Sequence, residues 1–323
     1  MSATGVDPAT RDALQRVDAF IAAHPEYTLQ GAPPLPQGST NRVLAARRGN
    51  HLVVLKVFCE DERKERECVA LRHWRPTGLV PELLFDDDPR LIVTSFVRGG
   101  YLSRTLRHDT GALGLATCRQ VGSALAQLTL VPLPLADRAA FEARFYAGLG
   151  RLEEYLGRIL ALGRGVHGRD PDFTGARWSR SLDFVAAEVP ALLAQPRALY
   201  HQDAGNLHVE RGAFCGFFDL EMCRVGGPAL QLAASPVLDA VPATWEAFRR
   251  AWEETTGASL TPQELRCAAA AHHLLCWREI TRYMSYDGTP GTGYAWASPA
   301  DPGEYHERLA AADALLGVSG AGG

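Results

Sequence analysis

The chain has 323 residues, 46% of them hydrophobic and 22% charged, which is the composition of an ordinary globular protein. Its net charge of −4 and pI near 6.2 argue against a nucleic-acid-binding surface. No apolar run approaches the roughly 20 residues of a membrane span, and residues 1–7 have neither the basic nor the apolar region of a signal peptide. Seven cysteines without a Cys-x-x-Cys pair favour reduced thiols, so we expect a cytoplasmic protein with no membrane or nucleic-acid partner.

An amphipathic helix is predicted over residues 10–23, with its larger apolar residues at helical spacing: Leu14, Val17, Phe20 and Ile21. A proline-rich stretch then leads to Gly38-Ser39-Thr40-Asn41. Residues 42–46 and 51–58 are rich in strand-forming side chains. We predict that they form two strands joined by a hairpin turn at 48–50.

Lysine is rare in this chain, because only Lys56 and Lys64 occur against 31 arginines. Lys56 lies inside an apolar strand, where its ammonium must reach outward or meet anions. A compact ammonium suits bridging phosphate groups. The charged helix predicted over residues 61–74 offers Glu67 as a partner for Lys56, although Glu67 could also belong to a solvated helix face. Lys64 is interpreted as a solvated surface charge.

After a further strand near residues 91–97, Arg98-Gly99-Gly100 breaks the pattern. We place the domain boundary there, which divides the chain into residues 1–97 and 98–323. The second part is predicted to be mainly helical, with helices at about 111–130, 136–162, 178–194, 243–256, 262–285 and 303–316. The fold class expected is therefore α+β.

Residues 199–221 interrupt these helices and predict a strand, a polar loop, a strand, a turn and a third strand. The loop carries Asp203 and Asn206, and Asp219 ends the last strand directly after two phenylalanines. A carboxylate beside buried aromatic residues is costly unless a positive group meets it. Two carboxylates and an amide are oxygen ligands suited to Mg²⁺, so this region predicts the metal-binding half of a phosphoryl-transfer site.

The order of these motifs resembles the aminoglycoside phosphotransferase and choline kinase family over about residues 30–235. The resemblance implies a two-lobed, protein-kinase-like fold. Its N-lobe would be an antiparallel sheet with one helix that binds the nucleotide, and its C-lobe would be mainly helical, with the catalytic loop and the substrate region. It also implies an enzyme, an ATP- and Mg²⁺-dependent O-phosphotransferase that acts on the hydroxyl of a small molecule.

The resemblance assigns roles to individual residues. Asp203 would be the catalytic residue, either as the base or as the group that orients the hydroxyl. Lys56 would hold the α and β phosphates, and Glu67 would hold Lys56. Asn206 and Asp219 would bind the metal. The remaining nucleotide contacts would come from the glycine loop and from the end of the fifth strand: Gly38, Ser39, Thr40, Thr94, Ser95, Phe96 and Val97. The acceptor would contact some of the polar residues in the second half: His208, Glu221, Glu279, Tyr283 and Asp287.

Two features depart from the family pattern. The family usually places its asparagine five residues after the catalytic aspartate, whereas here Asn206 is three residues after and His208 holds the fifth position. Because Leu207 and Val209 alternate as an inward-facing strand requires, we favour Asn206 as the ligand, with His208 as the alternative. Gly227 and Gln231 also stand where the family often carries acidic residues.

The acceptor is expected to be an antibiotic, such as an aminoglycoside, a nucleoside or another glycoside. The alternatives are an amino alcohol such as choline or homoserine, and a non-catalytic nucleotide-binding regulator. A protein kinase is disfavoured because no Ala-Pro-Glu element follows Asp219. The sequence does not indicate an oligomeric state.

Two other segments attract attention. Cys267, His272, His273 and Cys276 share one helical segment, and His273 and Cys276 could bind a metal, but local polar contacts are the preferred interpretation. The glycine-rich, aromatic segment 283–296 could form a lid over the acceptor or an ordinary surface loop.

Overall fold

The computed structural model describes residues 8–30, 41–134, 136, 138–146, 151–238, 240–283 and 301–318. The chain forms two compact units, Met1–Arg98 with Cys215–Met222 and Gly99–Phe214 with Cys223–Gly323. The predicted boundary after residue 97 thus lies next to the first crossing between units, and residues 215–222 fold with the first unit rather than the second. No helix in the described ranges is long and apolar enough to cross a bilayer.

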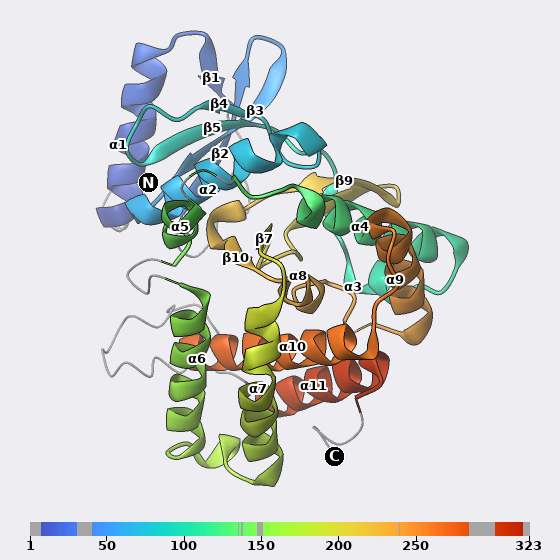
Figure 1. Ribbon diagram of the computed structural model, residues 1–323. Helices are drawn as coiled ribbons and strands as arrows, with labels where there is room; N and C mark the ends of the chain where they lie inside the picture. The colour runs from blue at the N-terminus through green and yellow to red at the C-terminus, as the bar shows by residue number, and fades with distance from the viewer. Residues whose placement is uncertain are drawn as a thin grey trace. The chain divides into compact units, whose positions relative to one another are not determined.

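The first unit contains a five-stranded antiparallel sheet in the order β1-β2-β3-β5-β4 (Figure 1). The strands are β1 (Tyr27–Leu29), β2 (Arg42–Arg48), β3 (His51–Val57), β4 (Leu83–Phe85) and β5 (Leu91–Ser95). The β2–β3 hairpin pairs Arg48 with His51 across Gly49 and Asn50, and Gly49 adopts φ 58°. This confirms the predicted hairpin, since a two-residue turn needs left-handed backbone that glycine supplies without strain.

One face of this sheet packs against α1 (Pro8–Ala23). The buried apolar residues of this core are Ala13, Val17, Phe20, Tyr27, Ala46, Val53, Leu55, Val57, Leu91 and Val93. Leu14, predicted to lie with Val17 and Phe20, is instead 43% exposed, and the smaller Ala13 takes the inward position. Because side chains alternate along a strand, Val53, Leu55 and Val57 point into this core and Lys56 points to the opposite face.

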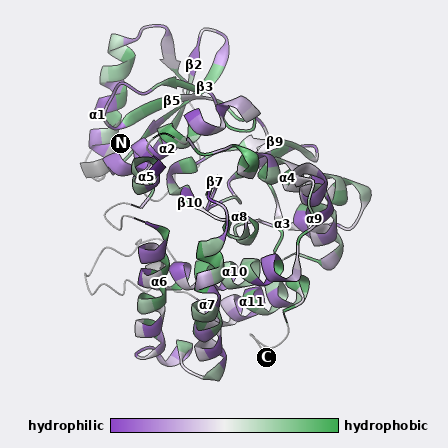
Figure 2. Ribbon diagram, viewed as in Figure 1, coloured by the Kyte–Doolittle hydropathy of each residue, from purple (hydrophilic) through white to green (hydrophobic). Residues whose placement is uncertain are grey.

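The second unit is mainly helical, as predicted. Its longer helices are α4 (Ala112–Leu130), α6 (Leu152–His167), α7 (Ala176–Ala194), α9 (Pro242–Thr256), α10 (Pro262–Tyr283) and α11 (Pro302–Leu316). Helix α4 packs against α9, and α10 contacts α6, α7 and α11 (Figure 1). Figure 2 shows hydrophobic and hydrophilic residues alternating around α6 and α7, the pattern of helices that bury one side only.

The single helix predicted over residues 136–162 is wrong. The structure has a short α5 (Arg138–Ala143) and a separate α6 that begins at Leu152. The sequence between them includes Gly148 and Gly150, and each glycine costs about 1 kcal/mol in a helix relative to alanine. Phe145 and Tyr146, which follow α5, are buried.

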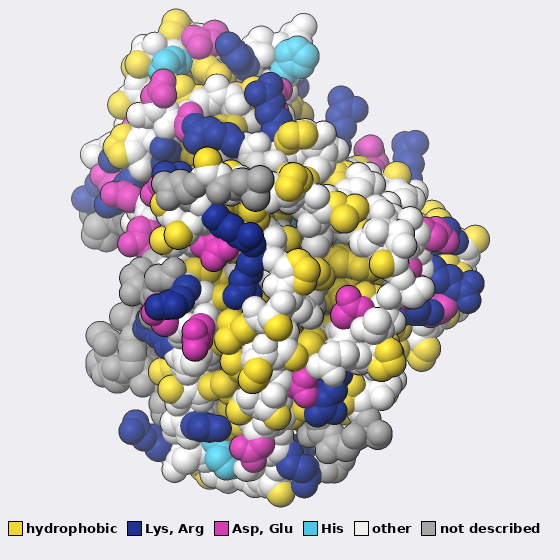
Figure 3. Space-filling view, viewed as in Figure 1, with side chains coloured by type: hydrophobic (Ala, Val, Ile, Leu, Met, Phe, Trp, Pro, Cys, Tyr) yellow, Lys and Arg dark blue, Asp and Glu magenta, His cyan; other side chains and the backbone are white. Residues whose placement is uncertain are grey.

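The predicted strand, loop and hairpin of residues 199–221 are confirmed. Strand β7 (Ala198–Tyr200) pairs with β10 (Arg224–Gly226), and β8 (Leu207–Glu210) pairs with β6 (Gly100–Tyr101). The turn into β9 (Ala213–Phe217) uses Arg211 at φ 52° and Gly212 at φ 80°. Short elements, α3 (Arg104–Arg107) and α8 (Pro228–Ala233), complete this region. On the face drawn in Figure 3, basic and acidic side chains are interspersed.

Candidate functional site

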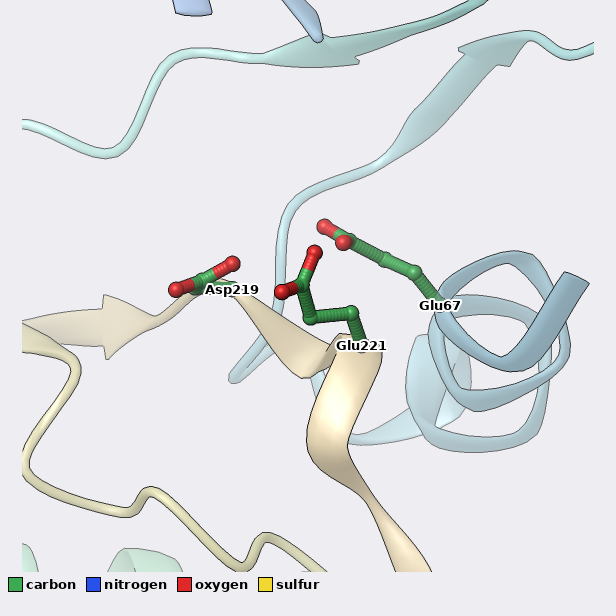
Figure 4. A group of neighbouring side chains, drawn as sticks. All are labelled: Glu67, Asp219 and Glu221. Atoms are coloured by element: carbon green, nitrogen blue, oxygen red, sulfur yellow. The ribbon is translucent and has the colours of Figure 1, made fainter. Parts of the chain in front are cut away.

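In the first unit, the ammonium of Lys56 lies among three carboxylates. Its Nζ is 2.6 Å from Glu67 Oε2 and 3.2 Å from Glu221 Oε2, and it also bonds to Asp219 Oδ1. Glu67 comes from α2 (Asp61–Trp74), whereas Asp219 and Glu221 come from the segment after β9 (Figure 4). The predicted Lys56–Glu67 pair is therefore present, and Glu67 is buried rather than part of a solvated face.

Glu221 was predicted to face the acceptor, but the structure gives it different neighbours. It is only 5% exposed, and its carboxylate accepts hydrogen bonds from Asn41 and, at 3.0 Å, from Arg63 Nη1. Its backbone carbonyl accepts a bond from Arg66 Nε at 3.0 Å. Sequence reasoning missed Asn41, Arg63 and Arg66, because nothing distinguishes these residues from the other charged and polar positions of the glycine loop and α2.

The charges in this cluster shift the titration of its members. Burial opposes the charge on Lys56, but Asp219, Glu67 and Glu221 outweigh it and hold the pKa of Lys56 well above its usual value. Burial raises the pKa of Glu67 to about 7, assisted by the negative Asp219 and Glu221 and opposed by Lys56. Arg63 also pairs with Glu221, with its Nη1 3.0 Å from Glu221 Oε1, so the cluster combines three carboxyl groups with two cationic side chains.

The donor set matches the metal that the resemblance implies. Glu67, Asp219 and Glu221 each offer a carboxylate oxygen, and these oxygens lie within 4.8 Å of one another. Hard oxygen donors of this kind suit Mg²⁺. Asp219 is the accessible member, because its side chain is 40% exposed while those of Glu67 and Glu221 are each 6% exposed. Asp219 also adopts φ 59°, a left-handed conformation that aspartate tolerates better than most residues and that is common at functional sites.

The structure describes some of the predicted nucleotide contacts and not others. Gly38, Ser39 and Thr40 lie outside the described residues. Thr94 pairs across the sheet with Val54, two residues from Lys56, and so shares the face of Lys56. Ser95 is turned toward β4, because its N–H donates to the Glu82 carbonyl at 2.9 Å and its Oγ accepts from the Glu82 N–H at 2.8 Å. Phe96 and Val97 follow the strand.

In the second unit, the loop after β7 carries Asp203. The side chain of Gln231 bonds to both backbone groups of His201, accepting from its N–H at 2.8 Å and donating to its carbonyl at 3.4 Å. Gln202 donates to the Tyr155 hydroxyl at 2.6 Å, and the N–H of Asn206 donates to the Asp203 carbonyl at 2.9 Å. The loop is thus held tightly in place, and Gln231 has a structural use that an acidic residue could not serve in the same way.

Asp203 lines a pocket whose other walls include residues of α3, α8, α10 and α11. Arg278 Nη1 lies 3.4 Å from Asp203 Oδ1. No pattern in the sequence predicted this contact. Glu279, a predicted acceptor contact, also lines this pocket, where Arg308 Nη1 is 2.8 Å from its Oε2.

His208, another predicted acceptor contact, packs edge-on against Tyr101, with ring centroids 5.4 Å apart. Tyr283 is the last residue of α10, its side chain is not described, and Asp287 lies outside the described residues.

A serine, a histidine and an aspartate also form a buried chain in the core of this unit. Ser181 Oγ is 3.0 Å from His273 Nδ1, and His273 Nε2 is 3.0 Å from Asp313 Oδ1. Trp277 Nε1 donates to Ser181 Oγ at 3.0 Å. The geometry resembles a hydrolase triad, but Ser181 is 1% and His273 0% exposed, so no substrate can reach them. The chain links α7, α10 and α11, which agrees with local polar contacts for this histidine.

The cluster around Lys56 and the loop that carries Asp203 can now be compared with known proteins. The sequence model of the phosphotransferase enzyme family matches residues 31–270. The chain belongs to this family. The expectation from the motifs is thereby confirmed at the level of the family: the protein is a phosphotransferase with a kinase-like fold. A search of curated sequences finds no match.

Solved structures share the fold at low sequence identity. The macrolide 2′-phosphotransferase MphH from Brachybacterium faecium is 20% identical, with a TM-score of 0.61 and coverage of 94% of this chain and 98% of that one. The aminoglycoside phosphotransferase APH(4)-Ia is 16% identical, with a TM-score of 0.60 and coverage of 96% and 99%. A choline/ethanolamine kinase family protein from Mesorhizobium loti is also 16% identical, with a TM-score of 0.57 and coverage of 94% and 95%. The predicted α+β, kinase-like fold is therefore confirmed.

Proposed function

We propose that this protein transfers the γ-phosphoryl group of ATP to a hydroxyl of a glycoside or nucleoside antibiotic. The observation that carries the proposal is the buried ammonium of Lys56, joined to Glu67 and to Asp219 from a segment 163 residues later in the sequence. A buried lysine among carboxylates has little structural benefit by itself, because an apolar residue would avoid the desolvation penalty. It is well suited to receiving phosphate oxygens, which would replace part of the carboxylate contact.

In this proposal each residue has a role in positioning or in charge neutralisation. Lys56, oriented by Glu67, holds the phosphates, and Asp203 accepts a hydrogen bond from the acceptor hydroxyl and aligns its oxygen. The hydroxyl oxygen forms a bond to the γ-phosphorus while the bond from that phosphorus to the β,γ-bridging oxygen breaks. ADP leaves with the electron pair, and the hydroxyl proton passes to Asp203 and then to solvent.

We propose Asp219 and Asn206 as the Mg²⁺ ligands, with Glu221 holding Asp219 and Lys56 in register rather than contacting the acceptor. The ion, when bound, neutralises charge on the phosphates. Support comes from the exposure of Asp219 beside two buried carboxylates, and from the hydrogen bond that holds Asn206 against Asp203. Thr94 to Val97 would contact the adenine, although the N–H of Ser95 is already bonded to the Glu82 carbonyl.

The antibiotic acceptor is supported by what related structures contain. APH(4)-Ia has been solved with ADP and hygromycin B, and APH(2″)-IIa with streptomycin and ATP. An amino-alcohol acceptor has support from the choline/ethanolamine kinase family protein. The pocket beside Asp203 favours catalysis over a non-catalytic regulator, since a regulator needs no acceptor site.

The test is a direct assay for the phosphorylated product. Purified protein is incubated with ATP, Mg²⁺ and a panel of aminoglycosides, nucleoside antibiotics, other glycosides and amino alcohols, and each acceptor is examined for a gain of about 80 Da. Asp203→Asn should abolish the gain while ATP binding stays within a few-fold. Asp183→Asn, an exposed aspartate on α7, is the matched control. ATP binding without transfer to any acceptor would support the regulator instead.

A further inference from the structure

A second pocket, with a volume of about 510 Å³, lies in the first unit at the end of the sheet that carries the β2–β3 turn (Figure 1). Its walls come from three segments: the β2–β3 hairpin, the start of β4 with the residue before it, and the end of β5 with the residues after it. Lys56 and its three carboxylate neighbours are not among the described residues that line it. We call it the hairpin pocket.

The hairpin pocket is rich in guanidinium groups. Its charged lining residues are Arg47, Arg48, Arg98 and Glu82. Arg47 Nη1 donates to the backbone carbonyl of Asn50 at 3.2 Å, and Arg48 Cζ lies 5.5 Å from the centroid of the Tyr27 ring, so both have uncharged partners. Within the described part of the chain, Arg98 has no hydrogen bond, ion pair or ring contact. There, none of the three arginines pairs with a carboxylate.

The one acid of the lining, Glu82, has a partner outside the pocket. Its Oε1 lies 3.5 Å from Nη2 of Arg75, which does not line the pocket. The backbone of Glu82 is fixed to β5, because its N–H donates to Ser95 Oγ at 2.8 Å and its carbonyl accepts from the Ser95 N–H at 2.9 Å. Three positive side chains against one negative leave the lining with a net charge of at least +2.

The rest of the lining is partly apolar. Leu52, Leu84 and Phe96 contribute hydrophobic surface, and Leu52 is 39% exposed, so a ligand that covers it would bury apolar area. Ligand pockets commonly combine such walls with a few polar groups that fix the orientation of the ligand. A guanidinium fork matches a phosphate or a carboxylate. The chemistry therefore suits a compound that joins a multiply charged oxyanion to an apolar ring.

The hairpin pocket differs in position from the Lys56 cluster. Strand register puts Arg48 and Ser95 on the face of Val53, which is opposite to the face of Lys56. Ser95 and Phe96 also belong to the segment that we propose to contact the adenine, so the pocket adjoins the proposed nucleotide site at this point. An experiment on the pocket must therefore be made with the nucleotide site occupied.

We propose that the hairpin pocket is a further ligand site, which binds a multiply charged oxyanion attached to an apolar ring. The three arginines bind the oxyanion, and the apolar walls contact the ring. A phosphate ester and a ring dicarboxylate share this chemistry. The site is additional to those of the nucleotide and the acceptor, and it does not depend on the identity of the acceptor.

The experiment is calorimetric titration of the full-length protein in saturating ADP and Mg²⁺. Phenyl phosphate and phthalate are the two anionic ring compounds, phenol is the ring without the anion, and inorganic phosphate is the anion without the ring. The titrations are repeated for Arg48→Gln, Arg98→Gln, the double variant and Glu82→Gln. Arg72→Gln is the matched control, because Arg72 is an exposed arginine of the same unit that pairs with Asp86 and does not line the pocket.

We expect at least one anionic ring compound to bind the ADP-saturated wild type about tenfold or more tightly than both phenol and inorganic phosphate. Arg48→Gln and Arg98→Gln should each raise its Kd by about threefold and the double variant by about tenfold, since exposed charge pairs contribute modestly one at a time. Glu82→Gln should lower the Kd by about twofold, because it removes the one acid of the lining. Arg72→Gln should leave the Kd unchanged. The ratio of the Kd values for phenyl phosphate and phthalate distinguishes a phosphate site from a carboxylate site.

Three results would overturn the proposal. The first is that neither ring compound binds the ADP-saturated protein, and the second is that the double variant binds as tightly as Arg72→Gln. The third is that binding occurs only without ADP, because the pocket would then be part of the nucleotide site. No acceptor is present in these titrations, so failure of phosphoryl transfer is distinguishable from failure of this site. If the protein does not bind ADP, the proposed function fails, and the arginine variants alone decide the proposal.

Discussion

Lys56 Nζ lies 3.2 Å from Glu221 Oε2, so the single buried ammonium of the first unit faces a third carboxylate beyond Glu67 and Asp219. Glu221 is itself bonded to Asn41 and Arg63. The lysine is thereby connected to the start of β2 and to α2 through one glutamate. We regard this arrangement as the reason that Lys56 is held in one position before any phosphate arrives.

The two lysines of the chain should respond differently to substitution. Lys56→Ala removes the ammonium from three carboxylates and should raise the KM for ATP by at least about tenfold, the loss of one strong charge-assisted contact. Lys64 donates only to the Asp86 carbonyl, at 2.7 Å, so Lys64→Ala should leave that KM within about twofold. Initial rates measured against ATP concentration provide the comparison. Equal effects of the two substitutions would remove Lys56 from the nucleotide site.

Asp219→Asn should weaken Mg²⁺·ATP binding and turnover together, since a carboxylate is lost from the accessible side of the cluster. We expect the Mg²⁺ concentration for half-maximal rate to rise by at least about tenfold. Titration of the rate with Mg²⁺ at saturating ATP measures this. Asp86→Asn, which removes a surface partner of Arg72, is the control in the same unit. An unchanged Mg²⁺ dependence in Asp219→Asn would show that another residue binds the metal.

Asn206→Ala should cost much more activity than His208→Ala. Mg²⁺ prefers oxygen donors to imidazole, and the ring of His208 is stacked against Tyr101. We expect a loss of about 100-fold or more in kcat for Asn206→Ala, and for His208→Ala a rise in acceptor KM with the metal dependence retained. The measurement is kcat against Mg²⁺ for both variants. The reverse order would mean that the shortened loop uses His208 as the ligand.

The pH dependence of stability should carry the signature of Glu67. Its folded-state pKa of about 7 lies above the usual value of 4.5 for a glutamate, so the folded protein binds an extra proton between these pH values. The free energy of unfolding should therefore be greatest near pH 4.5 for this group and fall by about 1–3 kcal/mol as the pH rises to 7, then level off. Lys56, Asp219 and Glu221 face Glu67, and Lys56 remains charged throughout this range.

Urea denaturation at pH 5, 6, 7 and 8, without nucleotide or metal, measures this slope. Glu67→Gln lacks the titrating group, so its unfolding free energy should vary less over the same range. If the wild type and Glu67→Gln give parallel curves, the burial of Glu67 does not control its titration.

The buried chain of Ser181, His273 and Asp313 should affect stability and not catalysis. Ser181→Ala leaves the Trp277 N–H and a His273 nitrogen without their hydrogen-bond partner and should lower the unfolding free energy by about 1–3 kcal/mol. Ser179→Ala on the same helix α7 removes only an exposed contact to Asp183 at 3.4 Å and should cost less than about 0.5 kcal/mol. A loss of kcat in folded Ser181→Ala would assign the serine a catalytic role.

Local patterns predicted much of this protein. The rarity of lysine, the strand around Lys56 and the charged helix after it predicted the Lys56–Glu67 pair, because strand alternation and helix spacing act over a few residues. Likewise, the alternation of Leu207 and Val209 predicted β8. The contacts that were not predicted, Asn41–Glu221 and Arg278–Asp203, join residues 180 and 75 positions apart. Such pairs depend on how distant elements pack, and a surface arginine and a buried one look alike in sequence.

Helix breaks were also difficult to locate. The sequence between α5 and α6 includes Gly148 and Gly150, and the described residues Phe145 and Tyr146 are buried without being helical. Each glycine destabilises a helix by only about 1 kcal/mol relative to alanine. Packing of neighbouring side chains can exceed this cost, so helix propensity alone does not locate the break.

The return of residues 215–222 to the first unit has a consequence for synthesis of the chain. Asp219 follows Lys56 by 163 residues, so at about 5–20 residues per second it leaves the ribosome roughly 8–30 s later. During that interval Lys56 has Glu67 as its only acidic partner of the three. The first unit therefore cannot complete this charge balance co-translationally until residues 99–214 of the second unit have emerged.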